Sequence, residues 1–106
     1  LLLYPSSVWS KIQEKISKLP SFNKNARRIQ RLLIGHAEDI DVDSSGRILI
    51  SKPLREYALL SKKIILIGQG EKFEIWNQAT WNENVEMWRE EATSNDDEEA
   101  LSDLSI

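Results

Sequence analysis

Cysteine is absent from this chain of 106 residues, and histidine occurs only once. The absence of cysteine excludes disulfides and thiolate chemistry, and a reducing compartment is natural for such a chain. The single histidine, His36, falls on the inner side of an expected helix, where a packed side chain is commoner than a catalytic base. No apolar run approaches the ~20 residues that a membrane-spanning helix requires. We therefore expect neither thiol catalysis nor a membrane partner.

Basic residues are missing from the C-terminal end of the chain. Residues 90–106 contain seven acidic residues and no Lys or Arg, so residues 1–89 hold 14 basic and 10 acidic residues, a net charge of +4. The overall charge of −3 therefore conceals a mildly basic body. We expect residues 93–106 to form an acidic tail that is disordered or docks loosely on this body. Its short apolar anchor would be Leu101, Leu104 and Ile106.

A polar turn separates two apolar, alternating runs, Ile40–Val42 and Ile48–Ser51. This pattern predicts a β-hairpin whose loop has the sequence Asp-Ser-Ser-Gly-Arg. Asp43 can accept hydrogen bonds from turn N–H groups, and Gly46 can adopt the left-handed conformation that completes the loop. Arg47 lies within reach of the Asp43 carboxylate, and an arginine held in this way suits phosphate or guanine edges. The alternative is an exposed hairpin in which Asp43 and Arg47 merely pair.

Three arginines cluster on one side of an expected helix over residues 25–37. Arg27 and Arg31 are one helical turn apart, Arg28 lies beside them, and no acidic residue occurs in this range. Like charges at this spacing cost about 0.2–0.5 kcal/mol unless an anion balances them. That anion would be a phosphate backbone or the carboxylates of a neighbouring subunit. A simple solvated face is the alternative.

The start of the chain repeats near its end. Residues 1–9 resemble residues 73–81 without gaps, at a constant offset of 72 positions. Apolar residues coincide at positions 1/73 and 3/75, aromatic residues at 4/76, and tryptophans at 9/81. The second copy is preceded by the hairpin, a short helix and a further strand. We therefore expect Leu1 to lie in the middle of a repeat, and the sequence to be a C-terminal piece that lacks the hairpin of the first copy.

The remaining patterns predict an α+β chain. Strands are expected over residues 40–42, 48–51, 63–67 and 72–76. Helices are expected over residues 6–19 (capped by Ser6 or Ser7), 25–37, 53–60 and from near 77–80 to 92. In the helix over residues 53–60 the inward-facing residues are Leu54, Tyr57 and Ala58. The last helix presents apolar residues at helical spacing: Trp81, Val85, Trp88 and Ala92.

Other candidates for chemistry are weak. Asp39, Asp41 and Asp43 alternate along an expected strand but lack the spacing of a calcium loop. Residues 68–70 (Gly-Gln-Gly) lack the third glycine of a dinucleotide site and predict a hairpin turn. Three tryptophans have side chains that can stack on nucleic-acid bases, but their expected strand and helix positions favour core or subunit packing. They are Trp76, Trp81 and Trp88. We therefore expect no enzyme, no metal, no cofactor and no small-molecule substrate.

Taken together, these residues resemble the MraZ family of bacterial transcriptional regulators, within the AbrB-like (SpoVT/AbrB) superfamily. The similarity covers almost the whole chain, including an Asp-Leu-Ser near its C-terminus. The matching segments are residues 27–37, 43–50, 54–58, 67–69 and 73–76. The combination is specific, whereas an Asp-x-x-Gly-Arg hairpin alone is weak evidence.

The resemblance implies two AbrB-like half-repeats that interlock as a swapped-hairpin barrel with inserted and C-terminal helices. The corresponding divisions are residues 1–19 (end of the first repeat), 20–37 (inter-repeat helix), 38–92 (second repeat with its following helix) and 93–106 (acidic tail). It also implies ring-shaped homo-oligomers, cytoplasmic and nucleoid-associated, on double-stranded DNA. The targets would be repeated boxes upstream of the cell-division and cell-wall gene cluster, including the protein's own operon.

The resemblance assigns DNA contact to Arg47, with Asp43 and Gly46 shaping its loop. Family members carry two Asp-x-x-x-Arg motifs, one in each repeat, and only the second is present in this sequence. One rival hypothesis is an assembly module, in which the hairpin and the three arginines form subunit contacts. Another is an antitoxin-like protein that binds a partner through its acidic segment, residues 90–103.

Overall fold

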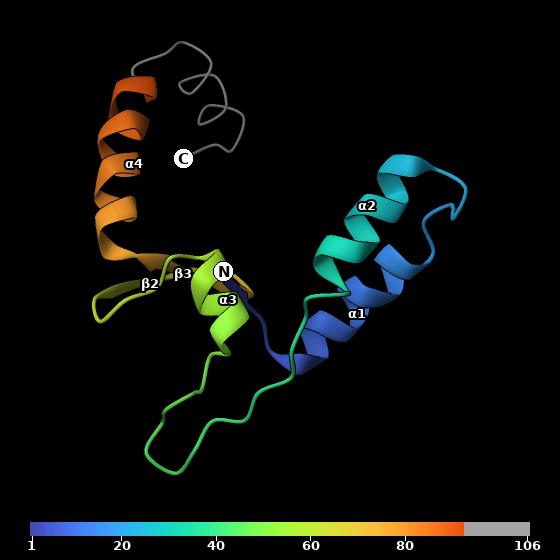
Figure 1. Ribbon diagram of the computed structural model, residues 1–106, viewed down its shortest axis with the longest axis horizontal. Helices are drawn as coiled ribbons and strands as arrows, with labels where there is room; N and C mark the ends of the chain where they lie inside the picture. The colour runs from blue at the N-terminus through green and yellow to red at the C-terminus, as the bar shows by residue number, and fades with distance from the viewer. Residues whose placement is uncertain (93–106) are drawn as a thin grey trace.

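The computed structural model describes residues 1–92, and the expectations for the acidic tail lie outside this range (Figure 1). The described chain combines helices with one antiparallel sheet, which confirms the α+β class. Its helices are α1 (Ser6–Ser17), α2 (Lys24–Leu33), α3 (Lys52–Tyr57) and α4 (Gln78–Glu91). Its strands are β1 (Leu2–Leu3), β2 (Ile64–Gln69) and β3 (Lys72–Asn77).

The sheet has the strand order β1-β3-β2, with β3 in the centre. β2 and β3 form the hairpin that the glycines at 68 and 70 predict, and Gly70 takes a φ of +69° in its turn. Ile75 lies in the middle of β3 and is only 4% exposed, whereas its cross-strand partner Leu66 is 55% exposed. The strand expected over residues 63–67 forms as β2, and because β2 is an edge strand its Ile64 and Leu66 remain exposed.

The two copies of the internal repeat pair with each other in space. Leu2 of β1 lies opposite Glu74 of β3, and these two positions are also related by the 72-residue offset. The pairing therefore has a local two-fold axis that passes between equivalent residues. The aromatic contacts repeat as well: the ring centroids are 5.7 Å apart in the Tyr4–Trp9 pair and 5.6 Å apart in the Trp76–Trp81 pair.

Helix α4 packs on the sheet through Trp81 and Trp88, which meet Trp76 of β3. Asn77 caps the start of the helix, because its side-chain oxygen accepts a hydrogen bond of 3.1 Å from the Thr80 N–H. Trp88 completes a cluster with Trp76 and Trp81, in which all three pairs meet edge-to-face at centroid distances of 5.4–5.6 Å. Each such contact contributes about 0.5–1.5 kcal/mol beyond the area it buries. The structure therefore confirms the helix expected from near residues 77–80 to 92 and the expected packing of its tryptophans.

Helices α1 and α2 form a hairpin that extends away from the sheet (Figure 1). Asn23 caps α2 by accepting hydrogen bonds from the N–H groups of Asn25 and Ala26. The side-chain amide of Gln30 joins the two helices by donating to the Ile16 carbonyl at 3.0 Å. Within residues 1–92 only Ala26 and Ile75 are buried.

The fold is less compact than that of a typical domain of the same length. Its radius of gyration is 16.9 Å, whereas a compact domain of this size has about 13 Å. Figure 1 shows the reason: residues 38–51 form a long loop that leaves the rest of the molecule and returns to α3. The fold therefore buries little apolar surface within one chain.

Several helix boundaries differ from the prediction. Helix α1 begins after Pro5 without a side-chain cap, so neither Ser6 nor Ser7 caps it, and it ends at Ser17 rather than at 19. Helix α2 ends at Leu33 rather than at 37. A side chain at Gly35 would collide with the Arg31 carbonyl oxygen if the chain kept its present path, and glycine avoids this collision.

Two expected inward-facing residues are exposed. His36 lies beyond the end of α2, where its Nδ1 is 3.1 Å from the Arg31 carbonyl oxygen and 3.2 Å from that of Leu32. The ring therefore covers unpaired helical carbonyls instead of entering a core. Tyr57, the last residue of α3, is also exposed, whereas Leu54 in the helix and Ala58 directly after it are half-buried.

The expected strands over residues 40–42 and 48–51 do not form. One backbone hydrogen bond joins the two arms across the loop, from the Asp43 N–H to the Arg47 carbonyl. Val42 is exposed, and Leu49 is 80% exposed. A two-stranded hairpin is marginal in water unless further strands or a helix cover it, and within the described chain nothing pairs with these arms.

Candidate nucleic-acid interface

The Asp43–Arg47 turn is closed by the Asp43 side chain. One carboxylate oxygen accepts hydrogen bonds from the N–H groups of Ser45 at 2.9 Å and Arg47 at 2.8 Å. The Gly46 N–H donates to the Asp43 carbonyl at 3.0 Å, and Gly46 has a φ of +79°. This conformation favours glycine because it is costly for residues with a Cβ atom. The loop chemistry predicted for Asp43 and Gly46 is therefore present.

The same carboxylate orients the guanidinium of Arg47. The Arg47 Nε donates to the second Asp43 oxygen at 2.9 Å, so the pair uses the inner edge of the guanidinium. Among the described residues, the two terminal nitrogens of Arg47 have no partner, and its side chain is 78% exposed. A guanidinium that keeps both terminal NH₂ groups can form the two parallel hydrogen bonds that guanine O6 and N7, or phosphate oxygens, accept.

The turn also favours the ionised form of Asp43. Hydrogen bonds from the Arg47 N–H, then from the Arg47 side chain and the Ser45 N–H, hold the pKa of the Asp43 carboxyl below its ordinary value of 3.8. A group with a lowered pKa stabilises the fold fully above its ordinary value, and this contribution is lost as the pH falls through the lowered value. The ordered turn is therefore maintained throughout the neutral range.

Removing the charge of Asp43 should release Arg47. In Asp43→Asn, the amide oxygen can still accept N–H groups, but no second carboxylate oxygen remains to accept the Arg47 Nε–H. The NMR signal of that Nε–H should therefore exchange faster with water at neutral pH. In the wild-type protein the signal should move when the pH falls below 3.8, whereas in Asp43→Asn it should not respond. An acid-independent wild-type signal contradicts this pairing.

The three arginines of α2 do not join this site. They lie on the α1–α2 hairpin, whereas the Asp43–Arg47 turn is at the end of the separate 38–51 loop (Figure 1). Arg27 donates to the Ser21 carbonyl at 2.9 Å, and Arg28 and Arg31 are exposed. No carboxylate of residues 1–92 lies within 4.0 Å of any of them.

The structure also shows a basic surface beside the loop that the sequence patterns did not lead us to expect. Lys52, Arg55 and Lys62 border a surface hollow of about 800 Å³ next to α3, which directly follows the second arm of the loop. Lys52 is 3.8 Å from the Glu56 carboxylate, and Arg55 has no ion pair within the described chain. Counting charges would have found this surface, because residues 51–63 contain four basic residues and one acidic residue.

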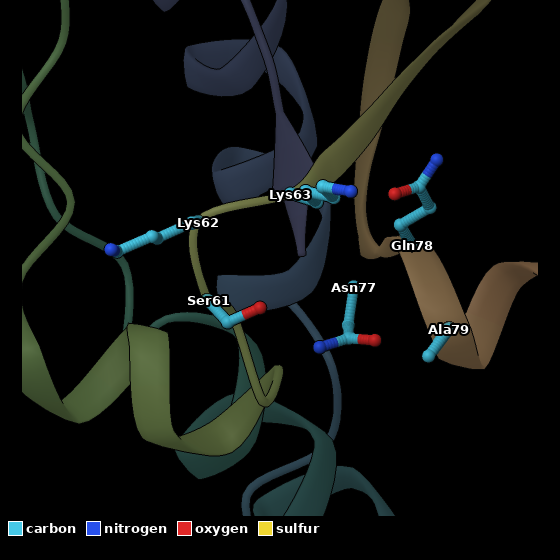
Figure 2. A pocket seen from close by; sticks show the side chains of 6 residues that line it. All are labelled: Ser61, Lys62, Lys63, Asn77, Gln78 and Ala79. Atoms are coloured by element: carbon cyan, nitrogen blue, oxygen red, sulfur yellow. The ribbon is translucent and has the colours of Figure 1, made fainter.

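A second hollow, of about 410 Å³, lies between the start of β2 and the start of α4 (Figure 2). Its lining residues are Ser61, Lys62, Lys63, Asn77, Gln78 and Ala79. Lys62 and Lys63 extend in opposite directions, and Asn77 is occupied because its amide donates to the Leu59 carbonyl at 2.6 Å. The lining contains no carboxylate or imidazole, so it offers no acid–base pair.

Residues 33–104 match the sequence model of a family described as "MraZ protein, putative antitoxin-like". The match covers the loop, α3, the β2–β3 hairpin and α4. The chain belongs to the MraZ family. This confirms the resemblance stated for the sequence.

Individual MraZ relatives are similar over most of the chain. The chain is 55% identical over 104 residues to a protein of Marinomonas sp. (strain MWYL1), covering 98% of this chain and 64% of the relative. It is 53% identical over 94 residues to a protein of Legionella pneumophila (strain Corby), covering 89% and 62%. Both relatives are named "Transcriptional regulator MraZ", and the chain spans less than two thirds of their length.

A third relative, from Alkalilimnicola ehrlichii, carries the same name and is 45% identical over 106 residues, which are 100% of this chain and 71% of the relative. Membership of a family whose proteins are named as regulators confirms the prediction that the chain is not an enzyme. Helices long and apolar enough to cross a bilayer do not occur among residues 1–92.

Proposed function

We propose that this MraZ protein is a transcriptional regulator that binds specific sequences of double-stranded DNA through Arg47. The observation that carries the proposal is the Asp43–Arg47 geometry: Nε donates to the carboxylate at 2.9 Å, and both terminal nitrogens of this exposed side chain lack a partner in the described chain. Asp43 and Gly46 shape the turn, and Arg47 contacts guanine edges in the major groove. The names of the three relatives support this proposal.

We further propose that the targets are repeated boxes upstream of the cell-division and cell-wall gene cluster, including the protein's own operon. This assignment depends on the family resemblance and on the presence of the second Asp-x-x-x-Arg motif. It places the protein in the cytoplasm, associated with the nucleoid. Repeated boxes suit a protein that presents several Arg47 turns at once, because linking weak sites raises avidity by about 10²–10⁴-fold.

Assembly supplies those copies. We propose a ring-shaped homo-oligomer in which AbrB-like half-repeats interlock as swapped-hairpin barrels. Residues 1–19 close the first half-repeat, 20–37 form the inter-repeat helix and 38–92 form the second half-repeat. Three observations support the arrangement: the arms of the 38–51 loop are apolar and unpaired within the described chain, few side chains are buried, and β1 and β3 pair about a local two-fold axis.

Binding of a labelled duplex from the region upstream of the protein's own gene tests the proposal. Fluorescence anisotropy should give an affinity about 10³-fold or more tighter than for a scrambled duplex of the same composition. Both affinities should fall as salt rises, because binding releases counterions from the phosphates. Equal affinity for the two duplexes contradicts sequence-specific recognition, and the absence of any salt dependence contradicts phosphate contact.

The basic surface beside the loop should contribute phosphate contacts that carry no sequence information. Arg55→Gln is therefore expected to weaken binding equally for the promoter and scrambled duplexes and to reduce the salt slope by about 1 for each contact removed. Lys11→Gln, which removes the same charge from α1, is the matched control and should leave the slope unchanged. A loss confined to the promoter duplex would instead make Arg55 a base-reading residue.

A further inference from the structure

Helix α2 presents two adjoining bands of side chains that the proposed DNA site does not use. The arginine band consists of Arg27, Arg28 and Arg31, and the apolar band consists of Ile29, Leu32 and Leu33. Positions three and four apart are neighbours on a helix, so Leu32 adjoins Arg28 while Ile29 adjoins both Leu32 and Leu33. All three apolar side chains are exposed, and Leu32 is 57% exposed.

Within residues 1–92, neither band has a partner that balances it. The principal packing partner of α2 is α1, which contacts the side of Ala26 and Gln30. No carboxylate of residues 1–92 lies within 4.0 Å of the arginine band. Exposed apolar area costs about 25 cal/mol per Å² relative to burial, and adjacent like charges favour an anionic partner. The surface therefore suits a ligand that carries carboxylates and aliphatic side chains side by side.

The C-terminal segment of the same chain has this composition. Residues 96–106 contain five carboxylates and no basic residue, and they end in aliphatic side chains. Its carboxylates are Asp96, Asp97, Glu98, Glu99 and Asp103, and its aliphatic residues are Leu101, Leu104 and Ile106. The family match extends into this segment as far as residue 104.

The segment is also long enough to reach α2. Leu101 and Leu104 lie nine and twelve residues after Ala92, and an extended chain of about 3.3–3.6 Å per residue spans roughly 30–32 Å to Leu101 and roughly 40–43 Å to Leu104. The longest dimension of the molecule is 40 Å. The basic side of α1 fits less well, because Lys18 is already paired with Glu14 at 3.0 Å and the apolar side of α1 is partly covered.

We propose that α2 is the docking surface for residues 96–106 of this chain, with carboxylates on the arginine band and Leu101 and Leu104 on the apolar band. The inference goes beyond DNA recognition and does not rest on it, because it concerns a contact within the protein. A docked segment neutralises the three guanidinium groups and covers Leu32.

The absence of cysteine makes a direct test possible. In Ser105→Cys, a nitroxide attached to the single thiol should broaden the NMR signals of the backbone amides of residues 28–33, while leaving those of the Asp43–Arg47 turn sharp. Salt of ~1 M, which shortens the Debye length to about 3 Å, should weaken the effect. Absence of broadening on α2, or equal broadening across all helices, overturns the proposal.

Two matched double variants in the labelled protein identify the surface. Arg28→Gln with Arg31→Gln removes two charges from α2 and should abolish the broadening there. Lys11→Gln with Lys15→Gln removes two charges from α1 and should leave it unchanged. Retained broadening in the α2 variant, or its loss only in the α1 variant, contradicts docking on the arginine band. Neither result depends on DNA, so failure here and failure of DNA recognition are distinguishable.

Discussion

Arg47→Ala is expected to abolish discrimination between the promoter duplex and its scrambled counterpart while leaving the protein folded. A bidentate arginine–guanine contact supplies about 1–3 kcal/mol of discrimination, or roughly 5–150-fold, for each copy that engages a box. An oligomer multiplies this loss, because several turns bind linked sites together. The fold should be retained because the Arg47 side chain is 78% exposed and, within the described chain, its guanidinium donates a hydrogen bond only to the Asp43 carboxylate.

Two further variants separate the roles of charge and geometry at this position. Arg47→Lys keeps the positive charge but loses the planar fork, so binding to the scrambled duplex should persist while preference for the promoter disappears. Arg89→Ala removes another exposed arginine, one that pairs with Glu86 on α4 at 3.4 Å, and should change neither affinity. Anisotropy with both duplexes measures all three variants, and circular dichroism checks the fold. Promoter preference in Arg47→Ala equal to that of the wild type contradicts the assignment of Arg47.

The Asp43–Arg47 turn could be predicted from the sequence because its causes are local. A carboxylate at the first position, a glycine that adopts positive φ and an arginine four residues after the carboxylate lie within five residues of one another. The hydrogen bonds that form involve only these residues and Ser45. The start of α4 near residues 77–80 and the β2–β3 hairpin depend equally on nearby residues, and both were predicted.

The flanking arms were not predictable in the same way. Alternating apolar residues at 40–42 and 48–51 favour strands, but a strand needs a neighbour to pair with its backbone. In the described chain that neighbour is absent, so the alternating apolar residues do not form strands. Tyr57 and Leu66 illustrate the related difficulty that an apolar residue in a regular element need not face a core.

The internal repeat was predicted, whereas the contact between its two copies was not. The offset of 72 residues was readable from matching aromatic and apolar positions, and the structure places Leu2 opposite Glu74. Sequence similarity alone does not specify whether two equivalent strands pair or lie apart. The basic residues in and after α3 were missed although a count of charges over residues 51–63 would have found them; what the sequence does not give is that the fold brings Lys52, Arg55 and Lys62 around one hollow.

Ile75→Ala is expected to produce the largest loss of stability among single apolar substitutions in the sheet. Ile75 occupies the centre of β3 and is 4% exposed. Truncating such a side chain lowers the free energy of unfolding by about 2–5 kcal/mol, because transfer energy is lost and a cavity remains. Urea unfolding followed by tryptophan fluorescence measures the change, since the cluster of Trp76, Trp81 and Trp88 adjoins the same strand.

Leu66→Ala is the matched control, because Leu66 lies directly opposite Ile75 in the β2–β3 pair. Full burial of a leucine contributes roughly 1.5–3 kcal/mol, and Leu66 keeps 55% of its surface exposed, so its truncation should cost much less. Measuring the same loss for Leu66→Ala at several protein concentrations then tests whether another copy of the chain packs on Leu66. If another copy covers this face of the sheet, the cost of Leu66→Ala should rise with protein concentration, whereas a folded monomer gives a constant cost. If both variants lose the same free energy of unfolding at low protein concentration, the burial of Ile75 is contradicted. The two residues are paired in the sheet, and the expected difference comes from their different exposure.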